Sequence, residues 1–106
     1  MAIKNISSNE FREMLAENPD SLEVVDVREQ DEYAVVKIKG SKLIPLSMIP
    51  LKINEIDWSK KVVLVCKSGA RSSHIAKLLS SAGKDVCNLV GGISELNSKN
   101  CPCLEK

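Results

Sequence analysis

The residues with the clearest chemical potential lie together in one short segment, Cys66-Lys67-Ser68-Gly69-Ala70-Arg71-Ser72. This segment directly follows the apolar run Val62–Val65 and precedes a stretch with helical periodicity. A thiol near a helix N-terminus meets free backbone N–H groups and the positive end of the helix dipole, and both favour the thiolate. Lys67 and Arg71 add positive charge, and Gly69 permits a turn in which successive amides point inward. The segment is therefore a candidate nucleophile within an anion-binding loop.

Two reactions suit a nucleophilic sulfur in such a loop. Cys66 could attack a phosphate and form a cysteinyl phosphate, or attack a sulfane sulfur and form a persulfide. The alternative is that Cys66 is only a small buried apolar residue at the end of a strand. Glycine, two cations and two serines gathered around one cysteine favour the nucleophile.

Alternating strand and helix patterns are expected to position this loop. Four β-favouring apolar residues in Val62–Val65 predict a strand buried on both faces of a parallel sheet. A helix is predicted over 72–82, and Gly83 marks its end. The expected buried face of this helix consists of Ile75, Leu78, Leu79 and Ala82.

The remainder of the chain continues the alternation. Ser7 and Glu10 form a potential capping box for a first helix that Asn18-Pro19 ends. Further strands are predicted over Leu22–Val27, Lys42–Pro45 and Val86–Val90, and short helices over Asp31–Val35, Leu51–Ile56 and Ile93–Leu96. This order predicts an α/β fold, a three-layer α/β/α sandwich around a mostly parallel central sheet.

Composition and charge narrow the possible functions of the 106 residues, which suffice for one domain. Only three aromatic side chains are present, too few for a stacking platform that binds single-stranded nucleic acid. No apolar run approaches the roughly 18–20 residues of a membrane span, and the first residues lack an apolar signal core, so a cytoplasmic protein is expected. Residues 60–84 contain six cations and no acid, which favours a small anionic ligand over DNA.

The motifs, taken in order, resemble the single-domain rhodaneses, the thiosulfate sulfurtransferase-like proteins. Residues 66–72 are similar to the active-site loop of that family. Residues 24–29 with Glu32-Tyr33 are similar to its "DVRE…EY" segment, residues 38–45 to its "HIPGAxNIP" segment, and residues 88–93 to its "xLxGGI" segment. The resemblance covers residues 3–97 and predicts a rhodanese-like domain over 1–98 with a polar tail over 99–106.

The resemblance implies a role for each matching residue. Cys66 would be the nucleophile that becomes the persulfide, and Asp26 and Arg28 would support the loop through polar contacts. A small anionic sulfur donor such as thiosulfate would bind here, and cyanide or a thiol would be the acceptor. A protein could also serve as donor or acceptor. No cofactor or metal would be required. The loop cradle and substrate contacts would come from Lys67, Ser68, Gly69, Ala70, Arg71 and Ser72.

Loop length bears on the choice between the two reactions. Four residues separate Cys66 from Arg71, whereas phosphatases related to this family carry a loop one residue longer. The tighter ring favours a persulfide sulfur over a tetrahedral phosphate, so a sulfurtransferase is the leading hypothesis. A persulfide carrier loaded by a partner protein is the alternative, and a phosphatase or arsenate reductase ranks third.

The other cysteines and the single histidine fall outside this loop. His74 is expected at the surface or rim, and Cys87 in the core. Cys101-Pro102-Cys103 lies in the polar tail and has three interpretations. The pair could resolve or accept the Cys66 persulfide, supply half of a thiolate metal site, or be two spare thiols in an exposed tail.

Overall fold

A five-stranded sheet forms the middle layer of the computed structural model, which describes residues 3–106. Each neighbouring pair of strands in this sheet is parallel. The strands run in the order β1 (Ile3–Ile6), β6 (Val86–Leu89), β5 (Lys61–Val65), β2 (Leu22–Asp26) and β4 (Lys42–Leu43).

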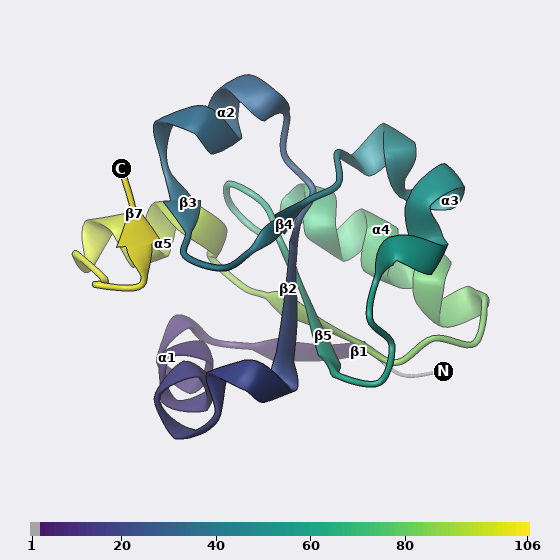
Figure 1. The fold of residues 1–106 in the computed structure, drawn as a ribbon, viewed down its shortest axis with the longest axis horizontal. Helices are drawn as coiled ribbons and strands as arrows, with labels where there is room; N and C mark the ends of the chain where they lie inside the picture. The colour runs from purple at the N-terminus through teal and green to yellow at the C-terminus, as the bar shows by residue number, and fades with distance from the viewer. Residues whose placement is uncertain (1–2) are drawn as a thin grey trace.

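Helices cover both faces of this sheet, as Figure 1 shows. On one face lie α1 (Ser8–Glu17) and α5 (Gly92–Ser98), and on the other lie α3 (Ile49–Lys52) and α4 (Ala70–Ser81). The prediction of a three-layer α/β sandwich with a mostly parallel sheet is therefore confirmed. The remaining helical segments are α2 (Gln30–Val35) and three short 3₁₀ helices, η1 (Pro19–Ser21), η2 (Leu46–Met48) and η3 (Ile53–Glu55).

The alternation of side chains along β5 decides which helix layer each one meets. Val63 and Val65 belong to a core that includes residues of α1 and α5, here called the α1/α5 core. Val62, Leu64 and Cys66 belong to the α3/α4 core on the opposite face. Since both faces are covered, every position from 62 to 66 is buried, as expected of a central parallel strand. The period of two thus directs Cys66 toward α4.

The sequence patterns located most helices within a few residues. The capping box is present: the Ser7 hydroxyl accepts the Glu10 N–H and the Glu10 carboxylate accepts the Ser7 N–H, each at 3.1 Å. The predicted buried face of the helix after the loop is partly wrong, because Leu78 is 55% exposed and Ala82 is also exposed. The face that meets the sheet consists of Ser72, Ile75, Ala76 and Leu79.

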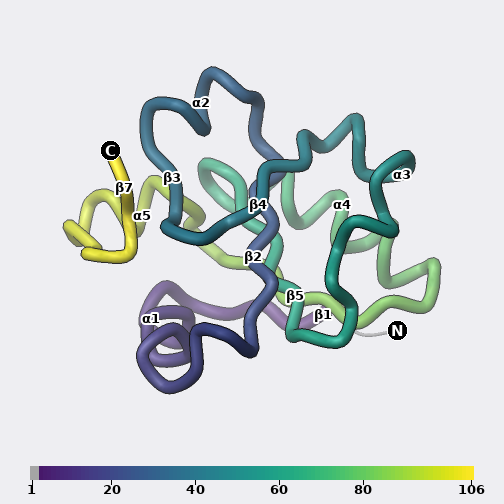
Figure 2. Tube along the Cα trace, in the orientation of Figure 1, coloured from purple at the N-terminus to yellow at the C-terminus, as the bar shows by residue number. Residues whose placement is uncertain are grey.

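Residues 99–106 pack against the domain. Strand β7 (Leu104–Glu105) pairs antiparallel with β3 (Lys37–Ile38), far away in sequence. The Cα trace in Figure 2 shows this chain end returning beside the segment that follows α2. Cys101 is buried in the α1/α5 core and forms a disulfide with Cys103. The interpretation as two spare thiols in an exposed tail is therefore wrong.

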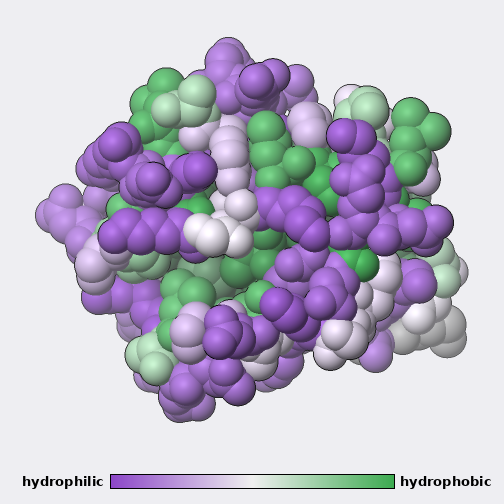
Figure 3. All heavy atoms as spheres, viewed as in Figure 1, coloured by the Kyte–Doolittle hydropathy of each residue, from purple (hydrophilic) through white to green (hydrophobic). Residues whose placement is uncertain are grey.

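The face of the molecule seen in Figure 3 is predominantly hydrophilic. Figure 3 shows polar side chains over most of one face, with hydrophobic groups in smaller patches near α2 and α3. Exposed large hydrophobic residues in these two regions include Val35 and Leu51. No helix within residues 3–106 has the length and apolar character needed to span a bilayer.

Candidate active site

The Cys66 thiol lies at the carboxyl end of β5, in the loop that leads into α4. Its Sγ accepts a hydrogen bond from the backbone N–H of Gly69 at 3.0 Å. Gly69 is the N-cap of α4 and has a φ of 97°, a left-handed conformation that glycine adopts without strain. The turn at Gly69 therefore aims a backbone donor at the sulfur and begins the helix at the same point.

The pKa of the Cys66 thiol is lowered although the side chain is only 1% exposed. Burial alone raises this pKa, since it removes water from the thiolate. Hydrogen bonds from the Ser72 hydroxyl and from the backbone N–H groups of Ser72, Ser68 and Gly69 outweigh burial and lower the pKa. The Ser72 hydroxyl and the backbone N–H groups of the loop thus stabilise a negative sulfur.

Ser72 links the sulfur to the neighbouring strand. Its hydroxyl lies within donating distance of Cys66 Sγ, 3.4 Å, and of Asn88 Oδ1, 2.5 Å. Asn88 lies on β6, and its side-chain amide donates to Asn5 Oδ1 on β1 at 3.3 Å. Since Ser72 and Asn88 are both buried, this chain of polar contacts holds the Ser72 side chain in place under the loop.

The start of α5 holds the loop from the opposite side. The N–H groups of Ile93 and Ser94 donate to the carbonyls of Cys66 and Lys67, each at 2.9 Å. A Cβ at Gly92 would collide with both of these carbonyl oxygens. These two hydrogen bonds fix the carbonyls of Cys66 and Lys67 on the α5 side of the loop. This close contact explains why position 92 of the Gly91-Gly92 pair requires a glycine.

Arg71 is paired with an acid rather than free. Its guanidinium donates to both carboxylate oxygens of Glu32 on α2, at 2.8 and 2.9 Å. The Arg71 hydrogen bonds hold the pKa of Glu32 down at about 2, and the Glu32 carboxylate in turn raises the pKa of Arg71. The Lys67 side chain is exposed and has no hydrogen-bond or ion-pair partner among residues 3–106, so it is the loop cation most open to an anionic ligand.

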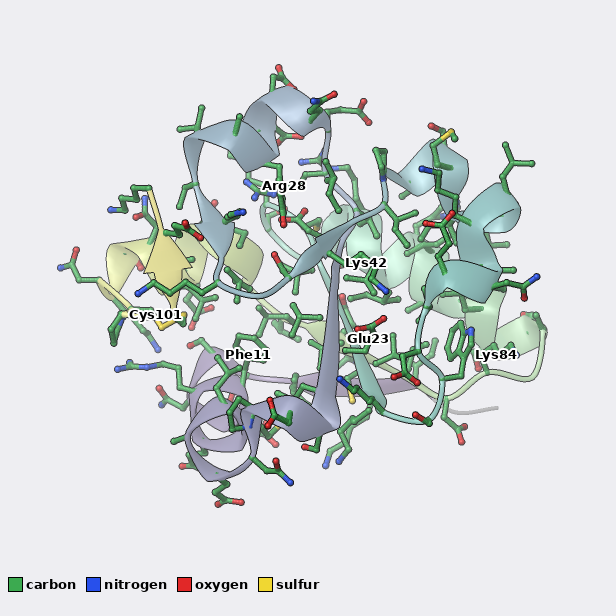
Figure 4. All side chains as sticks on the ribbon, in the orientation of Figure 1. Phe11, Glu23, Arg28, Lys42, Lys84 and Cys101 are labelled. Carbon is green, nitrogen blue, oxygen red and sulfur yellow. A yellow bond between two sulfur atoms is a disulfide. The ribbon has the colours of Figure 1, made fainter. Side chains whose placement is uncertain are left out.

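A buried ion pair supports the helix that carries Glu32. The Arg28 guanidinium donates to both carboxylate oxygens of Asp26, and the shortest of these contacts is 2.7 Å. The same guanidinium donates to the carbonyls of Val36 at 2.6 Å and Glu32 at 3.4 Å. Figure 4 shows Arg28 under α2, pointing toward the centre of the molecule. The Asp26–Arg28 pair therefore ties the end of β2 to the carbonyls of α2 and of the residue that follows it.

The structure brings the predicted loop residues together and separates the other candidates from them. Gly69 and Ser72 are buried beside Cys66, Arg71 is half-buried, and Lys67, Ser68 and Ala70 are exposed around them. His74 is exposed on α4, and Cys87 lies in the α1/α5 core across the sheet, both as predicted. Within residues 3–106, no three His, Cys, Asp or Glu side chains are grouped to hold a metal ion.

Three residues near the loop were not assigned to the site from sequence: Glu32, Asn88 and Gly92. Each comes from a different element and meets the loop only in the folded chain. Each lies within a segment that had been matched to a family motif, at "EY" or "xLxGGI". The motif match was the sequence signal that could have assigned these three residues to the site.

Known proteins are similar to this chain in sequence. The sequence matches the rhodanese-like domain family over residues 7–99. A protein of Allochromatium vinosum named "Sulfurtransferase" is 36% identical over 92 residues, covering 86% of this chain and 85% of its own. The "Thiosulfate:glutathione sulfurtransferase" of Saccharomyces cerevisiae is 29% identical over 106 residues, covering 85% of this chain and 76% of its own.

A solved structure agrees with these sequence matches. The rhodanese-like domain protein of Staphylococcus aureus superposes with a TM-score of 0.82 at 31% identity and covers 96% of each chain. The fold, the order of the motifs and the sequence relatives all indicate the same family. This chain belongs to the rhodanese-like domain family.

Proposed function

We propose that the protein is a sulfurtransferase that works through a persulfide on Cys66. The Cys66 thiolate attacks the outer sulfur of a donor such as thiosulfate, the sulfur–sulfur bond of the donor breaks, and sulfite leaves with the bonding electrons. A thiolate or cyanide then attacks the terminal sulfur of the persulfide. The Cys66–sulfur bond breaks, the acceptor leaves as a persulfide or thiocyanate, and the Cys66 thiolate is restored.

The observation that carries this proposal is the hydrogen bond from the Gly69 N–H to Cys66 Sγ at the start of α4. Backbone donors lower the pKa of Cys66, which supplies the thiolate for the first step. A persulfide that extends beyond Sγ would carry its charge toward the same loop, where amides stabilise an anion at no cost in reorganisation.

The charges around the loop support an anionic donor of modest affinity. Lys67 is exposed beside Cys66, whereas Glu32 balances the charge of Arg71. The yeast relative's name includes thiosulfate as a substrate, which supports that donor class here. The four-residue spacing between Cys66 and Arg71 supports sulfur over phosphate as the transferred group.

The test is intact mass and peptide mapping after incubation with thiosulfate. We expect wild type to gain one sulfur on Cys66 and to lose it to cyanide with formation of thiocyanate. Cys66→Ser should gain none, and Cys87→Ala, which removes the other free buried thiol, should behave as wild type. Sulfur on Cys87 rather than Cys66 would contradict the assignment.

The alternatives give different results in the same assay. A carrier loaded by a partner would not react with thiosulfate but would accept sulfur from a protein persulfide donor such as a cysteine desulfurase. Hydrolysis of p-nitrophenyl phosphate that depends on Cys66 would favour the phosphatase and contradict the argument from loop length.

A further inference from the structure

The Cys101–Cys103 disulfide lies outside the Cys66 site. Cys101 packs in the α1/α5 core, whereas Cys66 packs in the α3/α4 core across the sheet. Figure 4 shows Cys101 between β7 and α1, on the same side of the sheet as Phe11. This placement does not favour a direct relay of sulfur from Cys66 to the disulfide, so the pair needs its own explanation.

The disulfide forms one wall of a groove of about 650 Å³. The other wall is the exposed side of α1. The groove is lined by Asn9, Arg12, Glu13, Leu15 and Ala16 together with Cys101, Pro102 and Cys103. Since both cysteines line the groove, a small molecule that enters it can reach the bond between the two sulfurs.

A purely stabilising role explains this disulfide poorly. The two cysteines are two positions apart, and closing so short a ring removes little entropy from the unfolded chain. Backbone hydrogen bonds already hold the segment: Cys101 N–H donates to the Leu96 carbonyl at 3.0 Å, and Lys39 N–H donates to the Cys103 carbonyl at 2.9 Å. The bond could therefore open and close while the segment remains folded.

The two sulfurs have unequal surroundings. Cys103 is half-buried, whereas Cys101 is buried at 6% exposure. The Cys103 N–H donates to Cys101 Sγ at 3.3 Å. A backbone donor favours a thiolate at the sulfur that accepts it, so Cys101 is the better leaving group and Cys103 is the sulfur that an incoming thiol reaches.

We propose that Cys101-Pro102-Cys103 is a second site, at which the protein exchanges reversibly with small thiols that carry carboxylates. A thiolate attacks Cys103 Sγ, the bond between the two cysteines breaks, and Cys101 leaves as a thiolate. A second thiolate attacks the sulfur of the small molecule in this mixed disulfide and releases Cys103. Two molecules of the small thiol are thereby oxidised to one small disulfide. The two electrons and two protons that they lose reduce the protein disulfide to a dithiol.

Arg12 supplies the recognition. Its side chain is exposed on α1 and forms no ion pair with any side chain of residues 3–106. A free guanidinium beside the groove would bind a carboxylate with two parallel hydrogen bonds. Glu13 and Asn9 lie in the same wall and suit an ammonium or amide group, so a zwitterionic thiol matches the lining better than an uncharged thiol does.

The test of the exchange uses Cys66→Ser protein, which removes the proposed active-site thiol. The protein is equilibrated with mixtures of reduced and oxidised glutathione, quenched with acid, alkylated and weighed by mass spectrometry. We expect a reversible two-electron titration of the 101–103 pair while circular dichroism stays native. A pair that remains oxidised in fully reduced glutathione until the protein unfolds would overturn the proposal.

Single-cysteine variants test the roles of the two sulfurs. In the Cys66→Ser background, Cys101→Ser should take up one glutathione on Cys103 from oxidised glutathione. Cys103→Ser should react at Cys101 at least about tenfold more slowly, because Cys101 is buried. Equal rates at the two positions, with both variants folded, would contradict the assigned roles.

Arg12→Gln tests the recognition. We expect this variant to slow reduction by glutathione about three- to tenfold while reduction by uncharged 2-mercaptoethanol is unchanged. Arg12→Lys should recover part of the glutathione rate. Equal effects on both reductants would show that Arg12 acts on the disulfide rather than on a carboxylate and would overturn this part of the proposal.

Discussion

Cys66, just past the end of β5, and Cys87, within the neighbouring strand β6, are two buried, reduced cysteines, yet their pKa values shift in opposite directions. Cys66 is 1% exposed and its pKa is lowered, whereas Cys87 is 5% exposed and its pKa is raised. Burial raises the pKa at both positions. Exposure to solvent therefore does not explain the opposite pKa shifts of the two thiols.

The backbone around each sulfur makes the difference. Cys87 lies within a strand, where the N–H and carbonyl groups serve the sheet. Cys66 lies just past the end of its strand, where the chain turns into α4 and its N–H groups face the sulfur. Distant cations lower the pKa of Cys87 only partly. The comparison indicates that the Ser72 hydroxyl and the nearby backbone N–H donors lower the pKa of Cys66, and that Cys87 has no such donors among the causes of its shift.

The most severe test of this comparison removes each sulfur in turn. Cys66→Ser should reduce sulfur transfer from thiosulfate to cyanide by about 10³-fold or more, since it removes the nucleophile. Cys87→Ala should leave the rate within about twofold and lower stability by roughly 1 kcal/mol through the cavity it creates. Thiocyanate formation and urea unfolding measure the two effects. A comparable loss of rate in Cys87→Ala, with the protein folded, would contradict the distinction.

A second test displaces the loop through a substitution in α5 and leaves Cys66 itself unchanged. Gly92→Ala should lower the rate by about 10²-fold, because the new Cβ would displace the carbonyls of Cys66 and Lys67 and with them the amides that face Sγ. The matched control is Gly83→Ala, where φ is +89° but a Cβ meets nothing within 4 Å. It should cost roughly 1 kcal/mol in backbone strain and leave the rate unchanged. Equal rates in the two variants would disprove the role of α5.

The pH dependence of alkylation sharpens the comparison further. Iodoacetamide should modify Cys66 with a midpoint below that of an ordinary thiol, and Cys87 only at higher pH, following the directions of their pKa shifts. Ser72→Ala should move the Cys66 midpoint upward and slow sulfur transfer at neutral pH about two- to tenfold. Peptide mapping over a pH series measures both sites. Ser73→Ala, one position along α4, should leave the midpoint where it is in wild type.

The smallest expected effect concerns the support of the loop by α2, which has no counterpart at Cys87. The pKa of Glu32 is about 2 in the folded protein against 4.5 normally, so its contribution to stability is complete above pH 4.5 and declines as pH falls toward 2. Since this ion pair is partly exposed, Glu32→Gln should cost roughly 1 kcal/mol at pH 7.

Chemical unfolding at several pH values measures this contribution. The difference between wild type and Glu32→Gln should shrink as the pH is lowered from 5 toward 3. Asp31→Asn, at an exposed acid beside Glu32, serves as the control and should show no such dependence. A difference that stays constant with pH would mean that the ion pair is not its source.

The elements that were predicted well are those whose signals are local in the sequence. The apolar run at Val62–Val65, the capping box at Ser7 and the loop after Cys66 each occupy a few consecutive residues, and the structure has a strand, a helix start and a turn there. Leu78 was misplaced because periodicity defines an apolar stripe on a helix but not which part of it faces the sheet. The short strands β3 and β7 carry no pattern of their own and form only by pairing with each other.

The sequence by itself determined the alternation of strands and helices, the family, and the cysteine that ends a buried strand before a helix, because these depend on neighbours along the chain. Tertiary structure alone decided which distant groups hold the loop around that cysteine. Glu32 meets Arg71 across 39 positions and Asn88 meets Ser72 across 16, and α5 binds the carbonyls of the loop. Such contacts join segments that only the folding of the sheet brings within hydrogen-bond distance, and hydrogen bonds act over about 3 Å.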